Sequence, residues 1–297
     1  MFSERYVITR ENDGVKIKDF LNTLGYSTRQ IIRIKKDTDS IRLNGRHVFV
    51  VESLHEGDEL VIRLLDNEKE TESCSIPVPI AYEDESVIVF DKPFGMACQV
   101  SKLHPHGTLQ NCFAHIFKER GENRTFRCLT RLDRDTSGLT LVAKNQLSAA
   151  LLSGRSEKTY FAIVHGEVKE NGTVDAPIGI ENEWEVVRKI LPNGQSAVTH
   201  YEILCKNNEY SFIKLKLETG RTHQIRVHMS HIGHPLLGDE LYGGNHDIIS
   251  RQALHCGEMA FLSPATQQEV KISAPISEDM KKALKETGLY CQLSQNE

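Results

Sequence analysis

The sequence lacks any apolar run long enough to cross a membrane. Its longest apolar stretches, such as Val87 to Phe90, have the length of a strand, whereas a membrane-spanning helix needs about 20 apolar residues. The first residues, Met1 to Tyr6, also lack the apolar core of a secretion signal. We therefore expect a cytoplasmic protein that has no membrane partner, and its polar composition favours a monomer.

Paired cysteines and metal-binding motifs are also missing. The seven cysteines are odd in number, scattered, and never arranged as Cys-x-x-Cys, which favours reduced thiols over a disulfide framework or a zinc site. Four histidines form another candidate metal group: His223, His228, His231 and His234. No acidic ligand lies in register with them, and Gly233 and Pro235 should end their helix, so we expect hydrogen-bonding histidines and no metal.

Positive charge is scarce overall, because the net charge is −5. This argues against a protein that attracts phosphate over its whole surface. Residues 14 to 46 are the exception, with eight basic residues against three acidic ones. The basic residues are Lys16, Lys18, Arg29, Arg33, Lys35, Lys36, Arg42 and Arg46. Either a local nucleic-acid-binding face or a merely solvated basic face is possible here.

The first 66 residues have the pattern of a small domain. Apolar residues from Ile17 to Leu24 recur at helical spacing, and Ser27 can cap a second helix over residues 29–36, with apolar and basic faces. Strands are predicted over 41–45, which ends in an Asn-Gly turn, then over 47–51 and 60–64. The basic face of the second helix is the candidate RNA-binding surface: Arg29, Arg33, Lys35 and Lys36.

Residues 67–75 form a predicted linker, since the run from 66 to 73 is polar and mostly acidic. Residues 76–297 then form a second domain. Helices are predicted near 108–120, 147–153, 223–231 and 278–287, and strands over 87–90, 139–144, 160–164, 197–204 and 210–217. The pattern is typical of an α+β fold with a mixed or antiparallel sheet.

The segment from Thr130 to Leu139 reads Thr-Arg-Leu-Asp-Arg-Asp-Thr-Ser-Gly-Leu and carries the main candidate for catalysis. Arginine on either side can keep the carboxylate of Asp133 ionised, as a nucleophile requires. Gly138 lets another backbone, or a nucleotide, approach closely. On these residues alone, a charged surface loop is an equally good interpretation.

Two further segments favour catalysis. Lys158-Thr-Tyr160 follows the aspartate segment, and residues 219–228 read Thr-Gly-Arg-Thr-His-Gln-Ile-Arg-Val-His. In this order the three segments resemble the signature motifs of the RluA-type pseudouridine synthases, over roughly residues 80 to 275. The helix, helix, hairpin order of the first domain is similar to the S-four-type, or alpha-L, RNA-binding domain.

The resemblance implies a cofactor-independent isomerase that converts uridine in structured RNA to pseudouridine. Its catalytic residues would be Asp133, Tyr160 and Arg226. Asp133 would attack the sugar or the base, or assist elimination; Tyr160 would stack on the uracil and accept the carbon 5 proton, directly or through water. Arg226 is favoured over Arg221 as the partner of Asp133, although the two could be exchanged.

The resemblance also implies substrate-binding residues: Arg131, Arg221, His223 and Leu139. Arg131 would contact RNA or fill the gap left by a flipped base, with a surface salt bridge as the alternative. Leu139 can equally be a packing residue. We expect ribosomal RNA rather than transfer RNA as the substrate, and the motifs do not identify the uridine.

The sequence departs from the family pattern at two places. Thr130 stands where a histidine usually precedes Arg-Leu-Asp, and the His-Pro pair expected soon after Gly95 is displaced to His104-Pro105. These changes could alter RNA contacts without removing the nucleophile.

Two other functions compete with the enzyme interpretation. The run from Asp133 to Ser137 imitates the Asp-x-Asp-x-Thr motif of aspartate phosphotransferases, but the preceding segment is too polar for their apolar strand. A non-catalytic RNA-binding or ribosome-assembly protein on the same scaffold is the second alternative.

Overall fold

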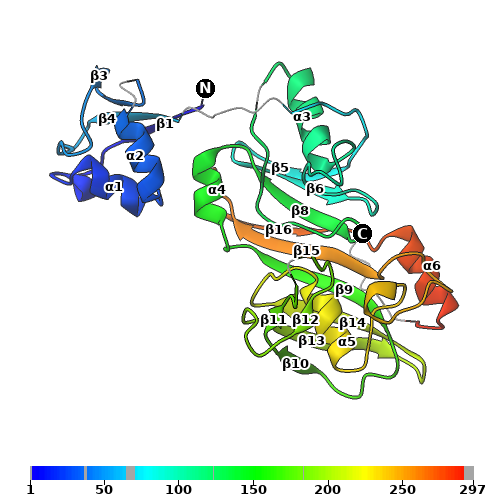
Figure 1. The fold of residues 1–297 in the computed structure, drawn as a ribbon. Coiled ribbons are helices and arrows are strands. Elements are labelled where there is room, and N and C mark those ends of the chain that lie inside the picture. Colours follow the sequence, from blue (N-terminus) through cyan, green and yellow to red (C-terminus); the bar gives the residue numbers. More distant parts are fainter. Residues whose placement is uncertain (1, 37–38, 65–70, 123, 183, 291–297) are drawn as a thin grey trace.

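The computed structural model describes residues 2–36, 39–64, 71–122, 124–182 and 184–290. Its N-terminal lobe packs two helices, α1 (Ile17–Thr23) and α2 (Thr28–Lys36), on an antiparallel sheet (Figure 1). The order in that sheet is β1 (Phe2–Val7), β4 (Glu59–Leu64), β2 (Ile41–Leu43) and β3 (Arg46–His47). A short 3-10 helix, η1 (Arg10–Asn12), follows β1.

Local chemistry explains where α2 begins. The side chain of Gln30 accepts a hydrogen bond from Ser27 N at 2.7 Å, and Gln30 N donates to Ser27 Oγ at 3.3 Å. This reciprocal pair satisfies backbone donors that the first turn leaves open. Buried Ile31 and Ile34 then turn one face of the helix toward the lobe's own core, which leaves the basic residues outside.

The larger unit is built on a ten-stranded sheet. Its main path runs β10 (Gly172–Asp175), β13 (Val198–Lys206), β14 (Tyr210–Leu217), β9 (Glu157–His165), β15 (Leu254–Leu262), β8 (Ser137–Ala143), β6 (Val87–Lys92) and β5 (Ile80–Glu83). Strand β16 (Glu269–Ser273) pairs with β15, and β7 (Arg127–Cys128) pairs with β8. Among the paired strands described, only β8 and β15 run parallel.

Four helices pack on this sheet at different places (Figure 1). They are α3 (Leu109–Glu119) beside β5 and β6, α4 (Gln146–Leu152) facing the N-terminal lobe, α5 (Gln224–His231) over β13 and β14, and α6 (Glu278–Glu286) at the C-terminal end. A small hairpin of β11 (Ile178–Gly179) and β12 (Lys189–Ile190) lies near α5, and η2 (Glu240–Tyr242) follows it in the chain.

The N-terminal lobe contacts the larger unit at α4. Gln30 Nε2 donates to the Gln146 carbonyl at 3.3 Å, and Leu147 belongs to the apolar core of the lobe. Of the predicted linker, residues 67–70 lie outside the described residues. Thr71 and Glu72 accept hydrogen bonds from side chains of α3, so the described part of the linker packs with the larger unit.

The α+β prediction is confirmed, and the four helices predicted in the second domain correspond to α3, α4, α5 and α6. The strand predicted over 47–51 is wrong beyond His47, because Val48 and Val50 pack into the core of the lobe from irregular backbone. Cys205 is disulfide-bonded, so the prediction of reduced thiols is wrong at this residue. None of the described helices has the length and apolarity that a membrane span requires.

Candidate active site

Asp133 lies in the loop between β7 and β8, and hydrogen bonds within the loop and to its neighbours hold this loop in place. Thr130 Oγ1 accepts a hydrogen bond from Leu141 N at 2.7 Å, and Thr136 N donates to the Asp133 carbonyl at 3.1 Å. Leu132 N donates to Cys98 Sγ at 3.4 Å. Thr130 therefore has a structural role, in place of the histidine that the family pattern leads one to expect.

For Gly138 the sequence left two explanations open: close approach of another backbone segment, or of a nucleotide. Its φ is +109°, and a Cβ placed there would lie 2.2 Å from the Cys256 carbonyl oxygen. The backbone that approaches is thus the parallel strand β15, which pairs with β8 at this point. This close approach places the loop of Asp133 against the centre of the sheet.

Arg226 on α5 is the arginine that reaches Asp133. Its Nη1 donates to Asp133 Oδ2 at 3.3 Å. The guanidinium is buried and is held in turn by Asp239, to which Nε and Nη2 both donate at 2.7 Å. Its Cζ also lies over the ring of Tyr242, 5.0 Å from the centroid. Such a bidentate, stacked arginine has a fixed orientation, which lysine could not reproduce.

His223 caps α5 in a left-handed conformation, with φ of 58°. Its Nδ1 lies 2.8 Å from the Tyr242 hydroxyl and its Nε2 lies 3.8 Å from Asp133 Oδ2. Burial lowers the pKa of His223 more than the Asp133 carboxylate raises it. We therefore treat His223 as neutral near pH 7, a polar neighbour of Asp133 and not its ion-pair partner.

Arg221 lies further out, where its Nε donates to the Ser196 carbonyl at 3.0 Å. The N-terminus of α5 is attached to β13 by Gln224, which accepts from Arg221 N at 2.9 Å and donates to the Val198 carbonyl at 2.9 Å. The Gly-Arg-Thr-His-Gln segment is thus a turn that carries α5, and Arg226 with it, to the aspartate loop.

A cleft of about 690 Å³ opens over these residues. Asp133, Tyr160 and Arg226 line it together, and so do three predicted substrate-binding residues: Arg131, Arg221 and His223. Lys158 adds another cation. The wall is therefore mainly positive although the chain as a whole is negative, which suits a polyanionic ligand.

Tyr160 lies in β9 and is 6% exposed. Burial raises its pKa well above the ordinary value, so the phenol stays protonated near pH 7. It can therefore accept a proton only if its own proton leaves at the same time.

Leu139 does not line the cleft. It is fully buried in the core of the larger unit, together with Leu132. Because it follows Gly138 inside an entirely buried strand, its side chain packs under the sheet face instead of reaching a substrate. This position favours the packing interpretation of Leu139 over the substrate-binding one.

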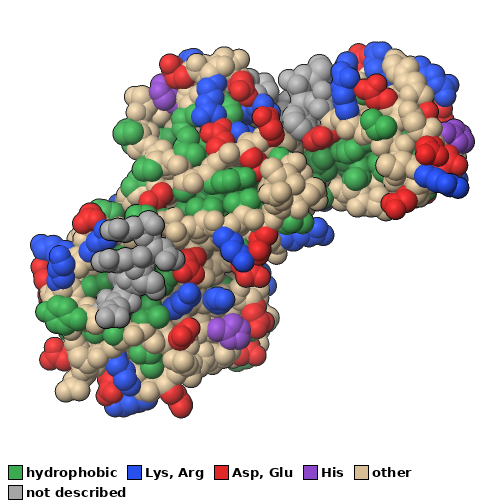
Figure 2. Space-filling view, turned by 180° about the vertical axis from the view of Figure 1, so that it is seen from behind, with side chains coloured by type: hydrophobic (Ala, Val, Ile, Leu, Met, Phe, Trp, Pro, Cys, Tyr) green, Lys and Arg blue, Asp and Glu red, His purple; other side chains and the backbone are tan. Residues whose placement is uncertain are grey.

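The four predicted RNA-binding residues are all exposed on α2 in the N-terminal lobe, and none of them lines the cleft. In Figure 2 the Lys and Arg side chains of this lobe are seen on its outer surface, interspersed with acidic ones.

His228, one of the candidate metal ligands, lies within hydrogen-bond distance of Thr199 Oγ1 and the Ala176 carbonyl, both at 2.9 Å. Over the described ranges, no group of three or more potential ligands could hold a metal ion.

The sequence reasoning missed two residues of the site, Asp239 and Tyr242. Both lie in the segment from His231 to Gly244, where Gly238 has a φ of +75° and would clash with the Arg251 backbone if it carried a side chain. In the sequence Asp239 is an ordinary acidic residue after a glycine and Tyr242 an ordinary aromatic one, so no local signal marks either as part of the site.

Comparison with known proteins gives consistent matches. The family model described as RNA pseudouridylate synthase matches residues 86–231. The uncharacterized RNA pseudouridine synthase YjbO of Bacillus subtilis (strain 168) is 42% identical over 277 residues, which cover 91% of this chain and 98% of that protein. The ribosomal large subunit pseudouridine synthase D of Vibrio parahaemolyticus is 37% identical over 244 residues, or 75% of each chain. The solved structure of human RNA pseudouridylate synthase domain containing 1 has a TM-score of 0.56 and 26% identity, covering 71% of this chain and 86% of that one.

Proposed function

The chain belongs to the RNA pseudouridylate synthase family and is an isomerase that acts on uridine in RNA, and from this premise we propose how its cleft performs the reaction. Isomerisation breaks the bond between N1 of uracil and the ribose and forms a bond from carbon 5 to the same ribose carbon. Overall, a proton leaves carbon 5 and N1 gains one. No electrons are transferred and no group comes from outside the nucleotide, so the reaction needs neither a redox cofactor nor a group donor.

Asp133 supplies the carboxylate that this rearrangement needs, by bonding to the sugar or the base or by assisting elimination. One observation carries the proposal: Asp133 lies in a cationic cleft, and its Oδ2 accepts from an arginine that Asp239 holds rigidly. Orientation of this kind lowers the barrier without any further reorganisation during the reaction.

Tyr160 forms the aromatic wall on which the uracil stacks, and it relays the carbon 5 proton. Its raised pKa supports a relay rather than a free phenolate base: as the phenol takes the carbon 5 proton it passes its own proton to water, from which N1 takes up the proton that it gains. Arg131, Lys158 and Arg221 at the cleft wall bind the phosphates on either side of a flipped nucleotide.

The substrate that we propose is ribosomal RNA, since the name of the Vibrio relative specifies the large ribosomal subunit. Residues 1–66 form a separate RNA-binding domain through the basic face of α2. We further propose that the protein acts as a cytoplasmic monomer.

The test is release of tritium from RNA labelled at carbon 5 of uridine, with the protein and its Asp133→Asn variant. The intact protein should release tritium, and Asp133→Asn should lose at least about 10³-fold, as removal of a nucleophile usually does. The matched control is Asp175→Asn, because Asp175 is exposed on β10 and does not line the cleft. Equal release by Asp133→Asn and the intact protein would contradict the role of Asp133. No release by the intact protein, with RNA binding retained, would favour the non-catalytic RNA-binding alternative.

A further inference from the structure

The residues directly after Asp133 are held one by one by side chains from distant parts of the chain. Lys92 Nζ donates to the Arg134 carbonyl and Arg251 Nη1 to the Asp135 carbonyl, each at 3.1 Å. The next two residues are held by their hydroxyl groups, in hydrogen bonds of 3.2 Å from Gln252 Nε2 to Thr136 Oγ1 and from Arg251 Nη2 to Ser137 Oγ. The backbone that carries the nucleophile is therefore fixed at consecutive positions.

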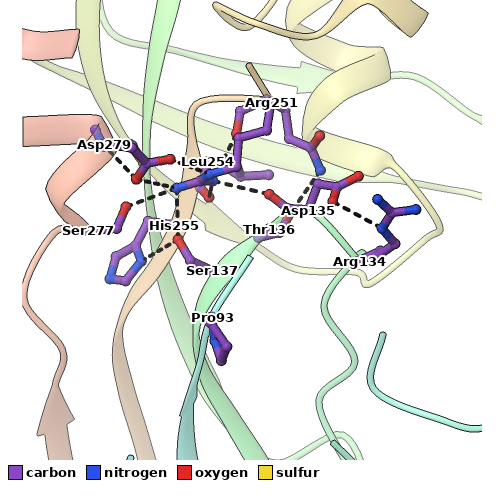
Figure 3. A network of polar contacts seen from close by, with 12 residues as sticks. Pro93, Arg134, Asp135, Thr136, Ser137, Arg251, Leu254, His255, Ser277 and Asp279 are labelled. Carbon is purple, nitrogen blue, oxygen red and sulfur yellow. Dashed lines mark hydrogen bonds and ion pairs between the residues drawn. The ribbon is translucent and has the colours of Figure 1, made fainter. Parts of the chain in front are cut away.

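Arg251 is the centre of this arrangement (Figure 3). Its side chain is 3% exposed, and its five N–H groups share seven oxygen acceptors. Two of these acceptors, Asp135 O and Ser137 Oγ, lie where the aspartate loop enters β8, and two others, Gln252 O and Leu254 O, lie where the chain enters β15. Arg251 thus joins the loop to the neighbouring strand.

The C-terminal helix orients this arginine. Asp279 in the first turn of α6 accepts from Arg251 Nε at 2.7 Å and from Nη2 at 3.0 Å, and Ser277 Oγ accepts from Nη2 at 2.9 Å. The ring of Phe94 covers the guanidinium, 4.8 Å from its centroid. Because the planar guanidinium has hydrogen bonds along its edges and an aromatic ring against one face, it cannot rotate without breaking several of these hydrogen bonds.

Neither Arg251 nor Asp279 lines the cleft, and the Arg251 side chain is only 3% exposed, so neither lies where the flipped nucleotide is proposed to bind. The contact of Arg251 with the Asp135 carbonyl gives it a direct route to the reaction through the loop. The loop is short, and Asp133 is separated from the anchored Asp135 carbonyl by a single residue. A shift of the anchor would therefore move the Asp133 carboxylate relative to the base in the cleft.

We propose that Arg251, oriented by Asp279, is a positioning residue that fixes the Asp133 carboxylate at the distance from the nucleotide which the reaction requires. The proposal rests on the function of Asp133 proposed above. It assigns to α6 a part in catalysis that its place at the C-terminal end of the larger unit does not suggest.

The test separates positioning from stability. Arg251→Lys keeps the charge but lacks the fork that reaches Asp279, the loop and the strand together. Because misplacement of a reacting group by about 1 Å can cost about 10²-fold, kcat should fall by about 10- to 100-fold, while KM and the Kd for RNA stay within about threefold. The matched control is Met280→Ala, whose side chain is fully buried on α6 next to Asp279 and packs in an apolar cluster that includes no residue from 133 to 137. It should lower the melting temperature and leave kcat unchanged when assayed well below that temperature.

Each outcome decides the matter. If Arg251→Lys keeps the kcat of the intact protein, or if Met280→Ala loses as much kcat as Arg251→Lys, the positioning role is wrong. Where Arg251→Lys does not fold, Asp279→Asn takes its place, with an expected fall of about fivefold or more in kcat at unchanged KM; an unchanged kcat overturns the proposal. An active intact protein with an inactive Asp133→Asn variant shows that the proposed function holds, so failure of the present proposal is recognised separately.

Discussion

At the scale of single residues, the site is built from ion pairs that connect Asp239, Arg226 and Asp133 in that order. Asp239 is almost completely buried and pairs with Arg226, and Arg226 keeps one N–H group for Asp133. The two carboxylates therefore differ in function. The buried one fixes the arginine, and the more exposed one faces the cleft.

Asp239→Asn should destabilise the protein strongly. The substitution leaves the buried Arg226 guanidinium without its full countercharge, and breaking a buried pair by removing one partner costs about 3 kcal/mol or more. The free energy of unfolding measured in urea checks this. The double variant Arg226→Met, Asp239→Leu removes both charges and should recover much of that stability while it remains inactive. Equal stability of Asp239→Asn and the intact protein would contradict the buried-pair argument.

Lys92 should give the reaction an alkaline limit. Its ammonium is fully buried and donates to the Pro93, Met96 and Arg134 carbonyls. Burial lowers the pKa of Lys92 from 10.5 to about 8. The charges of Cys98, Asp135 and Asp133 raise this pKa, and the charge of Arg251 lowers it further. Above that pH the neutral amine keeps only two N–H groups for three carbonyls. The kcat should therefore be full below pH 8 and fall as the pH rises through it.

This fall in kcat should not reflect unfolding. Between about pH 8 and 10.5 the unfolded chain binds the proton that the folded Lys92 has lost, so this group makes the folded state more stable as the pH rises. The pH profile of kcat, together with unfolding measured at the same pH values, checks both parts.

Cys98 also titrates nearby, because contact with Cys128 lowers its pKa to about 7. Cys98→Ser should keep the alkaline limit, whereas Lys92→Gln should be slow at every pH and lack it.

The residues of this site that lie in recognisable motifs could be identified from the sequence, whereas the residues that hold them in position could not. Asp133 and Arg226 lie in short runs of unusual composition, so both could be found. Lys92, Asp239 and Arg251 each look like an ordinary charged residue in the sequence. Their roles depend on contacts such as that of Arg251 with Asp135, 116 residues away, which no local pattern records.

At the scale of elements, the junction of β8 and β15 decides where the site forms. These strands pair in parallel only at Ser137 with His255 and Gly138 with Cys256. The loop of Asp133 enters β8 immediately before this pairing, and Arg251 precedes β15 by three residues. Close approach of the two strands therefore brings Asp133 and Arg251 into the same region.

Gly138→Ala should disrupt this junction. A Cβ would lie 2.2 Å from the Cys256 carbonyl oxygen, at a φ of +109° that side chains other than glycine rarely adopt. Backbone strain and overpacking together should cost about 3 kcal/mol or more. Gly220→Ala is the control, because nothing lies within 4 Å of its Cβ position, and it should change stability by less than about 0.5 kcal/mol. Urea unfolding of both variants measures the difference; similar midpoints would show that β15 can move away.

Elements with a strong local pattern were predictable, and those defined by pairing were not. The α3 helix has Thr108 and Asn111 as a capping box, and β14 has the predicted bounds, Tyr210 to Leu217. Strand β15 was not predicted although it lies at the centre of the sheet. Its sequence, Leu-His-Cys-Gly-Glu-Met-Ala-Phe-Leu, mixes glycine and charge with apolar residues. Its extended form is stabilised by β9, β8 and β16 together, which only the folded chain provides.

At the scale of the whole molecule, the distribution of charge distinguishes the two proposed sites of RNA contact from the rest of the surface. The chain carries a net charge of −5, yet the cleft wall holds Arg131, Lys158 and Arg221 and the α2 surface holds four further cations. A negative remainder would repel RNA that approaches elsewhere, so binding should be confined to these two regions. Both must be engaged together if the N-terminal lobe helps to select the substrate.

The dependence of RNA affinity on salt tests this arrangement. Replacing Arg29, Lys35 and Lys36 by glutamine should weaken binding and reduce the slope of log K against log salt by about 1 for each phosphate that is no longer neutralised. The kcat at saturating RNA should stay the same, since none of the three lines the cleft. Lys282→Gln, Lys285→Gln on α6 is the control for exposed cations outside both regions and should leave the slope unchanged. If the control lowers the slope as much as the α2 variant does, RNA binds through diffuse charge and the N-terminal lobe is not a dedicated binding surface.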